Sequence, residues 1–501
     1  MEAILQTLAL LSEPKVVGIV LLSAAYGLFI GAIPGLTATM ATALLVPFTF
    51  FLDPISGLVA IITMEAMAIF AGDIPAVLLR IPGTPSTAAY TEDSYELTKQ
   101  GKGEIALGLD LICSAIGGIM GAVAFIVGAP LLVLIAMNFT SFENFWLAVL
   151  GLSGAAMVSS GAPLKGTISA LLGLFLSTIG IDITLGYPRF TFGNVNLLNG
   201  ISFIPAMIGL YGISEVLRGA MSPHLEYPIA RLRAESIFQG VYQLLKRYKT
   251  QLFRGGLIGT FVGALPGAGA DIAAWLSYAV ARRFSREPEK FGKGSFEPII
   301  DAGTANNAAL GAAWIPALVF GIPGDPVTAI VIGVLMMKGL RPGPLIFQEQ
   351  AGLLNGLRMM FILANLLMLP LGYLAIRAGS SIIRIPRNVL MPIILAFSIV
   401  GAYALENSLF DVGIMLAMGI LGYLMEANGF PIAPVVLGLV LGPMIEQNFM
   451  ISMIKAQWNL LAFFSRPASL VLGVVTLVVW MLPVLMVLLR RRPLVEATPG
   501  G

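Results

Sequence analysis

The sequence predicts an all-α, polytopic membrane protein with about 12 transmembrane segments in two repeats. Three observations predict this fold class. The composition is strongly apolar, apolar runs recur along the whole chain, and two Pro-Gly motifs are each present twice.

The composition indicates whether the protein is surrounded by water or by lipid. The 501 residues are 57% hydrophobic and only 11% charged, with a mean hydropathy of +0.90. A soluble chain usually carries roughly 25% charged residues. A chain of this length could not hide so much apolar surface from water, so the lipid bilayer is its expected surrounding.

Apolar runs supply the second observation. A transmembrane helix needs about 20 predominantly apolar residues. The clearest runs are Val16–Ile33, Ile55–Gly72, Ile105–Ala129, Gly166–Ile181, Met359–Ile376 and Leu470–Leu489. Several runs are interrupted by Pro or Gly, so broken or re-entrant helices are expected among them.

Several function classes do not fit the sequence. No basic tract with interleaved aromatic residues is present, which argues against nucleic-acid binding. A single cysteine, Cys113, excludes an internal disulfide, and a single histidine, His224, leaves no cluster for a metal or haem. No Walker-type phosphate-binding motif is present, so this chain is not expected to hydrolyse ATP. We therefore expect no cofactor.

The duplicated Pro-Gly motifs are the third observation. Gly31–Gly35 (Gly-Ala-Ile-Pro-Gly) recurs as Gly263–Gly267, and Ile81–Pro85 (Ile-Pro-Gly-Thr-Pro) recurs as Ile322–Pro326 with Asp in place of Thr. The copies keep their order and nearly their separation. We therefore predict a first transmembrane repeat over residues 1–230 and a second over residues 231–501.

A Pro-Gly pair inside an apolar run has a physical meaning. Proline removes a backbone donor and clashes with the preceding turn, and glycine permits conformations closed to other residues. Non-helical backbone at membrane depth is tolerated only where it is buried in protein or lines a wet cavity. Breaks at corresponding positions of two halves therefore point to a transporter binding site, with ordinary helix kinks as the alternative.

The polar residues beside these breaks are the candidate binding residues. Small hydroxyl and amide groups can donate hydrogen bonds to a carboxylate without filling the cavity. Interhelical hydrogen bonding is the alternative for any single Ser or Thr. The candidate substrate-binding residues are Gly35, Thr37, Thr39, Gly83, Thr84, Ser86, Pro266, Gly267, Asp271, Thr304, Asn306, Asn307, Gly324 and Asp325.

Acidic residues in apolar segments suggest a coupling ion. A carboxylate at membrane depth is costly unless it has a partner or an ion, so Asp271 is the strongest candidate and Glu65 and Asp73 are weaker ones. Carbonyl groups freed at the breaks favour Na⁺, whereas an acidic side chain could instead carry H⁺. The candidate cation site lies near Pro34, Pro82, Asp271, Pro323 and Asp325.

Basic residues predict the orientation. The stretches Arg218–Arg254 and Arg282–Lys293 are rich in Lys and Arg, and both are expected on the cytoplasmic side. The apolar segment Leu257–Ala281 lies between them, so we predict a re-entrant hairpin that turns at Pro266-Gly267. The first copy has less basic flanks, which favours inverted repeats. Arg490–Arg492 predicts a cytoplasmic C-terminus.

Two polar stretches interrupt the apolar pattern. Tyr90–Glu104 and Asp182–Asn199 are predicted to be loops, the first of them solvated. Either could contact another subunit, but a plain connection is the simpler interpretation.

In this order, the motifs resemble the large membrane subunit of the tripartite tricarboxylate transporter family. The resemblance is carried by Gly27–Pro47, Ile74–Leu107, Gly259–Ala274 and Gly303–Pro344, and it covers nearly the whole chain. It implies two partners, a small four-helix membrane subunit and a periplasmic solute-binding protein. It also implies ion-driven uptake of carboxylates, such as citrate or dicarboxylates, across the bacterial inner membrane.

The expected function is therefore binding-protein-dependent uptake of small carboxylates by cation symport, with elevator-type alternating access. An anion channel and an intramembrane enzyme are the alternatives. A channel would be expected to show a filter contributed by several subunits. An enzyme would have to use Asp271 with Asp325, and no spacing supports that pair. A homo-oligomer is left open.

Overall fold

A computed structural model describes residues 11–158, 163–182, 186–221, 237–382 and 387–490 of the chain. His224, the proposed division near residue 230, part of the basic stretch Arg218–Arg254, and Arg491 and Arg492 lie outside the described residues.

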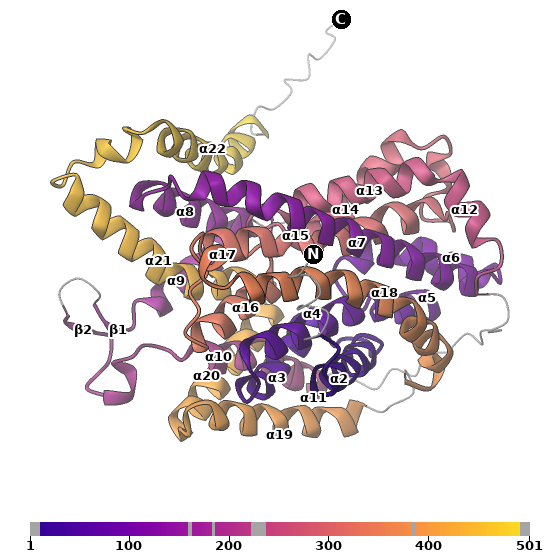
Figure 1. Ribbon diagram of the computed structural model, residues 1–501, viewed down its shortest axis with the longest axis horizontal. Helices are drawn as coiled ribbons and strands as arrows, with labels where there is room; N and C mark the ends of the chain where they lie inside the picture. Colours follow the sequence, from indigo (N-terminus) through magenta and orange to yellow (C-terminus); the bar gives the residue numbers. More distant parts are fainter. Residues whose placement is uncertain (1–10, 159–162, 183–185, 222–236, 383–386, 491–501) are drawn as a thin grey trace, which may run out of the picture.

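The described part of the chain is almost entirely helical, as predicted (Figure 1). The α-helices are α2 (Pro14–Gly31), α3 (Ala38–Phe50), α4 (Pro54–Ala71), α5 (Asp73–Leu79), α6 (Thr91–Lys99), α7 (Gly103–Ala136), α8 (Ser141–Val158), α9 (Pro163–Ser177), α10 (Phe203–Met207), α11 (Ser214–Met221), α12 (Val241–Arg247), α13 (Lys249–Gly263), α14 (Gly269–Phe284), α15 (Glu297–Phe320), α16 (Pro326–Met337), α17 (Ile346–Glu349), α18 (Ala351–Ile382), α19 (Arg387–Glu406), α20 (Leu409–Ala427), α21 (Ala433–Lys455) and α22 (Pro467–Arg490). The shorter elements used below are the 3₁₀ turn η1 (Thr87–Ala89), the π-helical segment η4 (Ile208–Ile213), and the strands β1 (Gly180–Ile181) and β2 (Pro188–Arg189).

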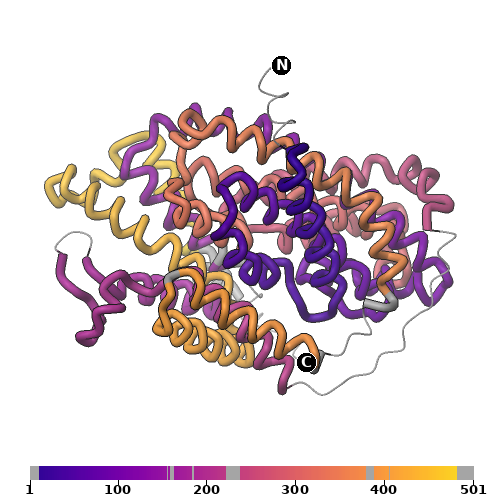
Figure 2. Tube along the Cα trace, turned by 60° about the horizontal axis from the view of Figure 1, so that its bottom comes forward, coloured from indigo at the N-terminus to yellow at the C-terminus, as the bar shows by residue number. Residues whose placement is uncertain are grey.

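The core lies around α4 and α15, whose residues are nearly all buried. Helix α15 packs against α7, α13 and α14, and α4 packs against α2, α3 and α18. In Figure 1, α7, α15 and α18 cross the middle of the molecule, while α19 lies along its lower edge. The antiparallel β1–β2 ladder projects from the helical body in both views (Figures 1 and 2).

Glycines let the central helices approach backbone to backbone, as is common in membrane proteins. A Cβ atom on Gly259 would lie 2.2 Å from the carbonyl oxygen of Ala305, and one on Gly263 would lie 2.4 Å from that of Ala309. Larger side chains at these two positions would push α13 away from α15. The packing of this helix pair therefore requires glycine.

The first half of the chain makes the corresponding contacts. A Cβ atom on Gly27 would lie 2.4 Å from the carbonyl oxygen of Met64, and one on Gly31 would lie 2.2 Å from that of Ala68. Gly31 is the motif equivalent of Gly263, so α2 packs on α4 as α13 packs on α15. The duplication in the sequence therefore has a counterpart in the helix packing.

The multi-pass helical class is confirmed, whereas the count of about 12 spans is not. In the described part of the chain, six stretches are long and apolar enough to cross a bilayer: Pro14–Gly31, Pro54–Leu79, Gly103–Ala136, Ala351–Gly379, Leu409–Ala427 and Ala433–Lys455. The predicted run Gly166–Ile181 falls mostly on α9, whose 15 residues extend about 22 Å, less than the roughly 30 Å of a hydrocarbon core.

The prediction of a solvated loop at Tyr90–Glu104 is wrong. This stretch contains helix α6, and Asp93 and Leu97 on it are buried. The Asp93 carboxylate accepts hydrogen bonds from the backbone N–H groups of Gly292 and Ser295, at 2.9 and 3.0 Å. Asp93 of α6 therefore binds the segment that follows α14 instead of facing water. The described part of Asp182–Asn199 is free of α-helix, as predicted.

Candidate transport cavity

Each of the four Pro-Gly motifs separates two helical segments, as predicted. Pro34-Gly35 lies between α2 and α3, Pro82-Gly83 between α5 and η1, Pro266-Gly267 between α13 and α14, and Pro323-Gly324 between α15 and α16. Gly35 and Gly267 adopt φ angles of +90° and +75°, a region that favours glycine. The sequence therefore places all four breaks correctly.

The breaks of the second half are joined directly. The backbone N–H of Gly267 donates a hydrogen bond to the carbonyl oxygen of Pro323 at 3.2 Å. Helix α14 also contacts the second break, because the indole N–H of Trp275 donates to the carbonyl oxygen of Pro85 at 3.2 Å. Three of the four motifs, from distant parts of the sequence, thus meet in one place.

A cavity of about 720 Å³ lies where the breaks converge. This volume is within the range of about 300–1,000 Å³ that is usual for small-molecule sites. The predicted site residues that line it are Gly35, Thr37, Thr39, Thr84, Ser86, Gly267, Asp271 and Asp325. Glu65, a weaker candidate from the sequence, also lines the cavity.

The other predicted site residues lie outside the lining, and four of them have packing or hydrogen-bonding roles. A Cβ atom on Gly83 would lie 2.5 Å from Cα of Gly72, and one on Gly324 would lie 2.8 Å from Cα of Ala313. The side chains of Asn307 and Thr304 bond within α15 or to α7, as described below. The set outside the lining is Gly83, Pro266, Thr304, Asn306, Asn307 and Gly324.

Helix N-termini face the cavity. Thr37 caps α3 by accepting a hydrogen bond from the N–H of Met40 at 3.2 Å. Asp325 caps α16 by accepting from the N–H of Thr328 at 2.7 Å, within a capping box. Helix α14 begins at Gly269, between two lining residues. The positive ends of three helix dipoles therefore point toward this space, which suits an anion.

The charged side chains of the cavity are mainly acidic. Five carboxyl residues line it: Glu65, Glu215, Asp271, Asp325 and Glu426. Among the described lining residues, Arg218 is the only basic one, and it pairs with Glu215 and, at 3.5 Å, with Glu426. The carboxyl groups of Asp271 and Asp325 are close enough to repel each other. Protons or cations would relieve that repulsion.

Sequence reasoning missed part of this lining. Glu215 and Arg218 come from α11, Tyr211 from η4, and Glu426 from the end of α20. None of these residues lies next to a Pro-Gly motif. Their position inside otherwise apolar segments was the one available signal.

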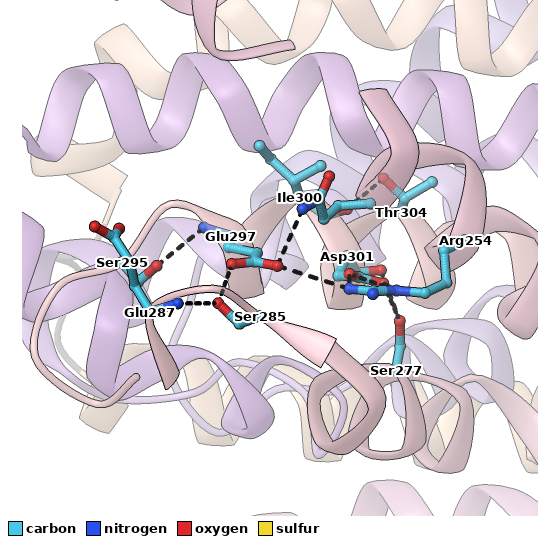
Figure 3. Close-up of polar contacts among 10 residues, drawn as sticks. Arg254, Ser277, Ser285, Glu287, Ser295, Glu297, Ile300, Asp301 and Thr304 are labelled. Carbon is cyan, nitrogen blue, oxygen red and sulfur yellow. Dashed lines mark hydrogen bonds and ion pairs between the residues drawn. The ribbon is translucent and has the colours of Figure 1, made fainter. Parts of the chain in front are cut away.

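The α13–α14 hairpin is fixed to α15 by a polar network (Figure 3). The Arg254 guanidinium forms an ion pair with the buried Asp301 carboxylate, with Nε 3.1 Å from Oδ2. The Ser277 hydroxyl donates to Oδ1 of the same carboxylate at 2.9 Å. Because Arg254 lies on α13 and Ser277 on α14, Asp301 holds both arms of the hairpin and so positions the third break.

Long apolar helices and four helix breaks around a cavity that contains charged side chains define a multi-pass membrane protein of the transporter class. The chain belongs to the tripartite tricarboxylate transporter TctA family, whose family model matches residues 17–437. It is therefore a membrane component of a tripartite system, which also comprises a periplasmic binding protein and a small membrane subunit.

Two proteins of Agrobacterium vitis are similar to the chain. The "Uncharacterized 52.8 kDa protein in TAR-I ttuC' 3'region" is 32% identical over 460 residues, which cover 91% of each chain. The "Uncharacterized protein in TAR-II ttuC' 3'region" is 36% identical over 228 residues, which cover 45% of this chain and 94% of the relative. No solved structure matches the chain.

Proposed function

We propose that the chain is the translocating subunit of a binding-protein-dependent secondary transporter that takes up small tri- or dicarboxylates, such as citrate, by cation symport. The cavity is the observation that carries this proposal. Helix N-termini face it with their positive ends, which suits carboxylate oxygens. Its five carboxyl residues would repel a bare anion, so the substrate enters together with cations.

Energetics favour the same coupling. Moving one charge through 100 mV is worth about 2.3 kcal/mol, so a trianion entering a negative cell faces roughly 7 kcal/mol. Co-transported cations cancel this charge and supply the driving force. Either Na⁺ or H⁺ satisfies the argument. Na⁺ would bind near Pro34, Pro82, Asp271, Pro323 and Asp325, whereas H⁺ would use an acidic side chain such as Asp271 or Asp325.

The proposed movement is elevator-type alternating access, with the four breaks carrying the substrate. Helices α13 and α14 have 15 and 16 residues, about 22–24 Å each, which is short of a roughly 30 Å hydrocarbon core. Their lengths support a hairpin that enters and leaves on the cytoplasmic side. We further propose inverted repeats, a cytoplasmic C-terminus and location in the bacterial inner membrane.

Uptake of labelled citrate into vesicles tests this function. The chain is reconstituted with its binding protein and small membrane subunit, under an imposed Na⁺ gradient, an imposed pH gradient, or none. Accumulation above equilibrium with one gradient supports symport and names the ion. Flux that only equilibrates would instead indicate a channel, and conversion of citrate to another compound would indicate an enzyme.

A further inference from the structure

A pair of buried acidic residues lies outside the cavity lining. Asp73, at the start of α5, and Asp110, on α7, are both fully buried. Their carboxyl groups are within hydrogen-bonding reach of each other. Neither residue lines the cavity, and the function proposed above does not use them.

The donors around this pair serve only one of the four carboxyl oxygens. Thr87 and Tyr90 donate their hydroxyl hydrogens to Oδ1 of Asp73, at 2.6 and 2.8 Å. No other donor in the described part of the chain reaches Oδ2 of Asp73 or either oxygen of Asp110. Buried acceptors of this kind are costly to leave unpaired.

Helix α15 packs directly against the site. A Cβ atom on Gly303 would lie 2.8 Å from Oδ1 of Asp110 and 3.9 Å from the hydroxyl of Tyr90. The next turn of α15 carries Asn307, whose amide donates to the hydroxyl of Ser114 on α7 at 2.9 Å. The amide oxygen of Asn307 is itself buried with no partner. The Asn306 amide, beside the Tyr90 hydroxyl, is buried as well, with its nitrogen and its oxygen both unpaired. Unpaired acceptor atoms therefore outnumber unpaired donor atoms here.

No basic side chain neutralises the pair. Within the described ranges, neither Asp73 nor Asp110 forms an ion pair with Lys, Arg or His. The other titratable groups nearby are Tyr90, Cys113 one turn along α7, and Asp301 on α15, which is paired with Arg254. Two ionised carboxylates at this depth would repel each other with little screening.

A proton on one carboxyl group would address both the unpaired oxygens and the repulsion between the two carboxylates. An ionised carboxylate only accepts hydrogen bonds, so a bond between two carboxyl groups requires one of them to hold a proton. We propose that Asp73 and Asp110 form a shared-proton site with a single negative charge. One proton then satisfies an otherwise unpaired oxygen and removes the repulsion, as in other carboxyl dyads.

Hydroxyl groups connect this site to the cavity. The Thr87 hydroxyl, bonded to Asp73, lies 2.7 Å from that of Thr84. The Thr84 hydroxyl lies 2.8 Å from that of Ser86, which contacts the Asp271 carboxyl. Hydroxyl groups both donate and accept hydrogen bonds, so the row of hydroxyl groups from Thr87 to Ser86 can pass a proton between the dyad and Asp271. The dyad is thus placed to be the coupling site for H⁺.

The inference rests on the proposed symport for its role, but the proton itself can be tested without transport. Infrared spectra of the purified protein in lipid would be compared between wild type and Asp110→Asn. The Asn amide can donate to Asp73, so the dyad keeps its charge and hydrogen bond but loses its proton. We expect the carbonyl stretch of one protonated carboxyl group to disappear.

A matched control is Asp411→Asn. Asp411 is also buried, but lies on α20, where it accepts a hydrogen bond from Ser202. Its substitution should leave the dyad signal in place. An unchanged protonated-carboxyl signal in a folded Asp110→Asn protein would overturn the shared-proton site, whatever the transport results show.

Transport then tests the coupling. In Asp110→Asn, stimulation of citrate uptake by an inward pH gradient should fall at least tenfold, while exchange of labelled for unlabelled citrate continues. Thr87→Val should slow the pH-driven uptake and Thr87→Ser should restore it, because only Ser keeps the hydroxyl. Wild-type uptake driven by Na⁺ alone would overturn the coupling role. Absence of driven uptake in wild type would overturn the proposed function but not the infrared result.

Discussion

The backbone N–H of Gly267 donates a hydrogen bond to the carbonyl oxygen of Pro323 at 3.2 Å, although 55 residues of chain separate the two helix breaks. Backbone groups at a membrane helix break need partners because lipid offers none. Here the third break supplies a donor and the fourth supplies an acceptor. The two irregular segments thus stabilise each other and form one wall of the cavity.

Substitution of Gly267 tests this wall. Its φ angle of +75° costs other residues roughly 1–2 kcal/mol, and a β-branched side chain is the least tolerant. We expect Gly267→Val to lower the melting temperature and to abolish citrate uptake. Gly413→Ala is the control, because Gly413 lies in helix α20 and a Cβ atom added there would meet no neighbouring segment within 4 Å. Normal uptake by Gly267→Val would show that the break is not part of the transport path.

Asp271 is the predicted site residue with the strongest support. It lies in the first turn of α14, lines the cavity and contacts Ser86. We expect Asp271→Asn to insert normally and to lose or change the ion dependence of uptake. The measurement is labelled citrate uptake against ion concentration, with Asp53→Asn as the control, because Asp53 caps α4 outside the cavity. An unaltered ion dependence in Asp271→Asn would remove Asp271 from the coupling mechanism.

Arg218 tests the charge balance of the cavity. It is paired with Glu215 and Glu426, so its removal leaves both carboxylates facing the substrate without their partner. We expect Arg218→Ala to raise the KM for citrate about tenfold, which corresponds to about 1.4 kcal/mol. The double substitution Arg218→Ala/Glu426→Gln should recover part of this loss. If the double variant is as weak as the single one, Arg218 contacts the substrate directly rather than balancing charge.

The breaks could be predicted from sequence because their cause is local. A proline lacks the N–H that a helix needs, and the following glycine accepts a positive φ angle, as Gly35 and Gly267 do. The duplication then indicated that the breaks belong together. Thr37, Thr84, Ser86 and Asp325 followed from their nearness to a break.

The remaining site residues depend on tertiary structure. Arg218 and Glu426 reach the cavity because α11 packs against α20, and no local pattern specifies that contact. Asn307 was predicted to bind the substrate, but it does not line the cavity. It precedes a break by more than one helical turn, and the rotation of α15 directs its side chain toward Ser114 on α7. Membrane helices are apolar on every side, so periodicity could not reveal that Asn307 faces α7 rather than the cavity.

The last prediction concerns the Arg254–Asp301 ion pair, which anchors the α13–α14 hairpin to α15. Asp301 is fully buried, and its charge is balanced by Arg254 across the α13–α15 contact (Figure 3). Removing one partner of a buried pair leaves an uncompensated charge, which costs roughly 3–5 kcal/mol. Arg254→Ala should therefore lower the melting temperature and impair uptake, because the third break loses its support.

A double substitution separates charge from packing at this anchor. Arg254→Met/Asp301→Asn removes both charges and keeps much of the volume, so it should be more stable than Arg254→Ala alone. Lys15→Ala is the control, because Lys15 forms an exposed pair with Asp53, and such pairs contribute roughly 0–1 kcal/mol. Equal melting temperatures for Arg254→Ala and the double variant would mean that the guanidinium packing, rather than its charge, holds the hairpin on α15.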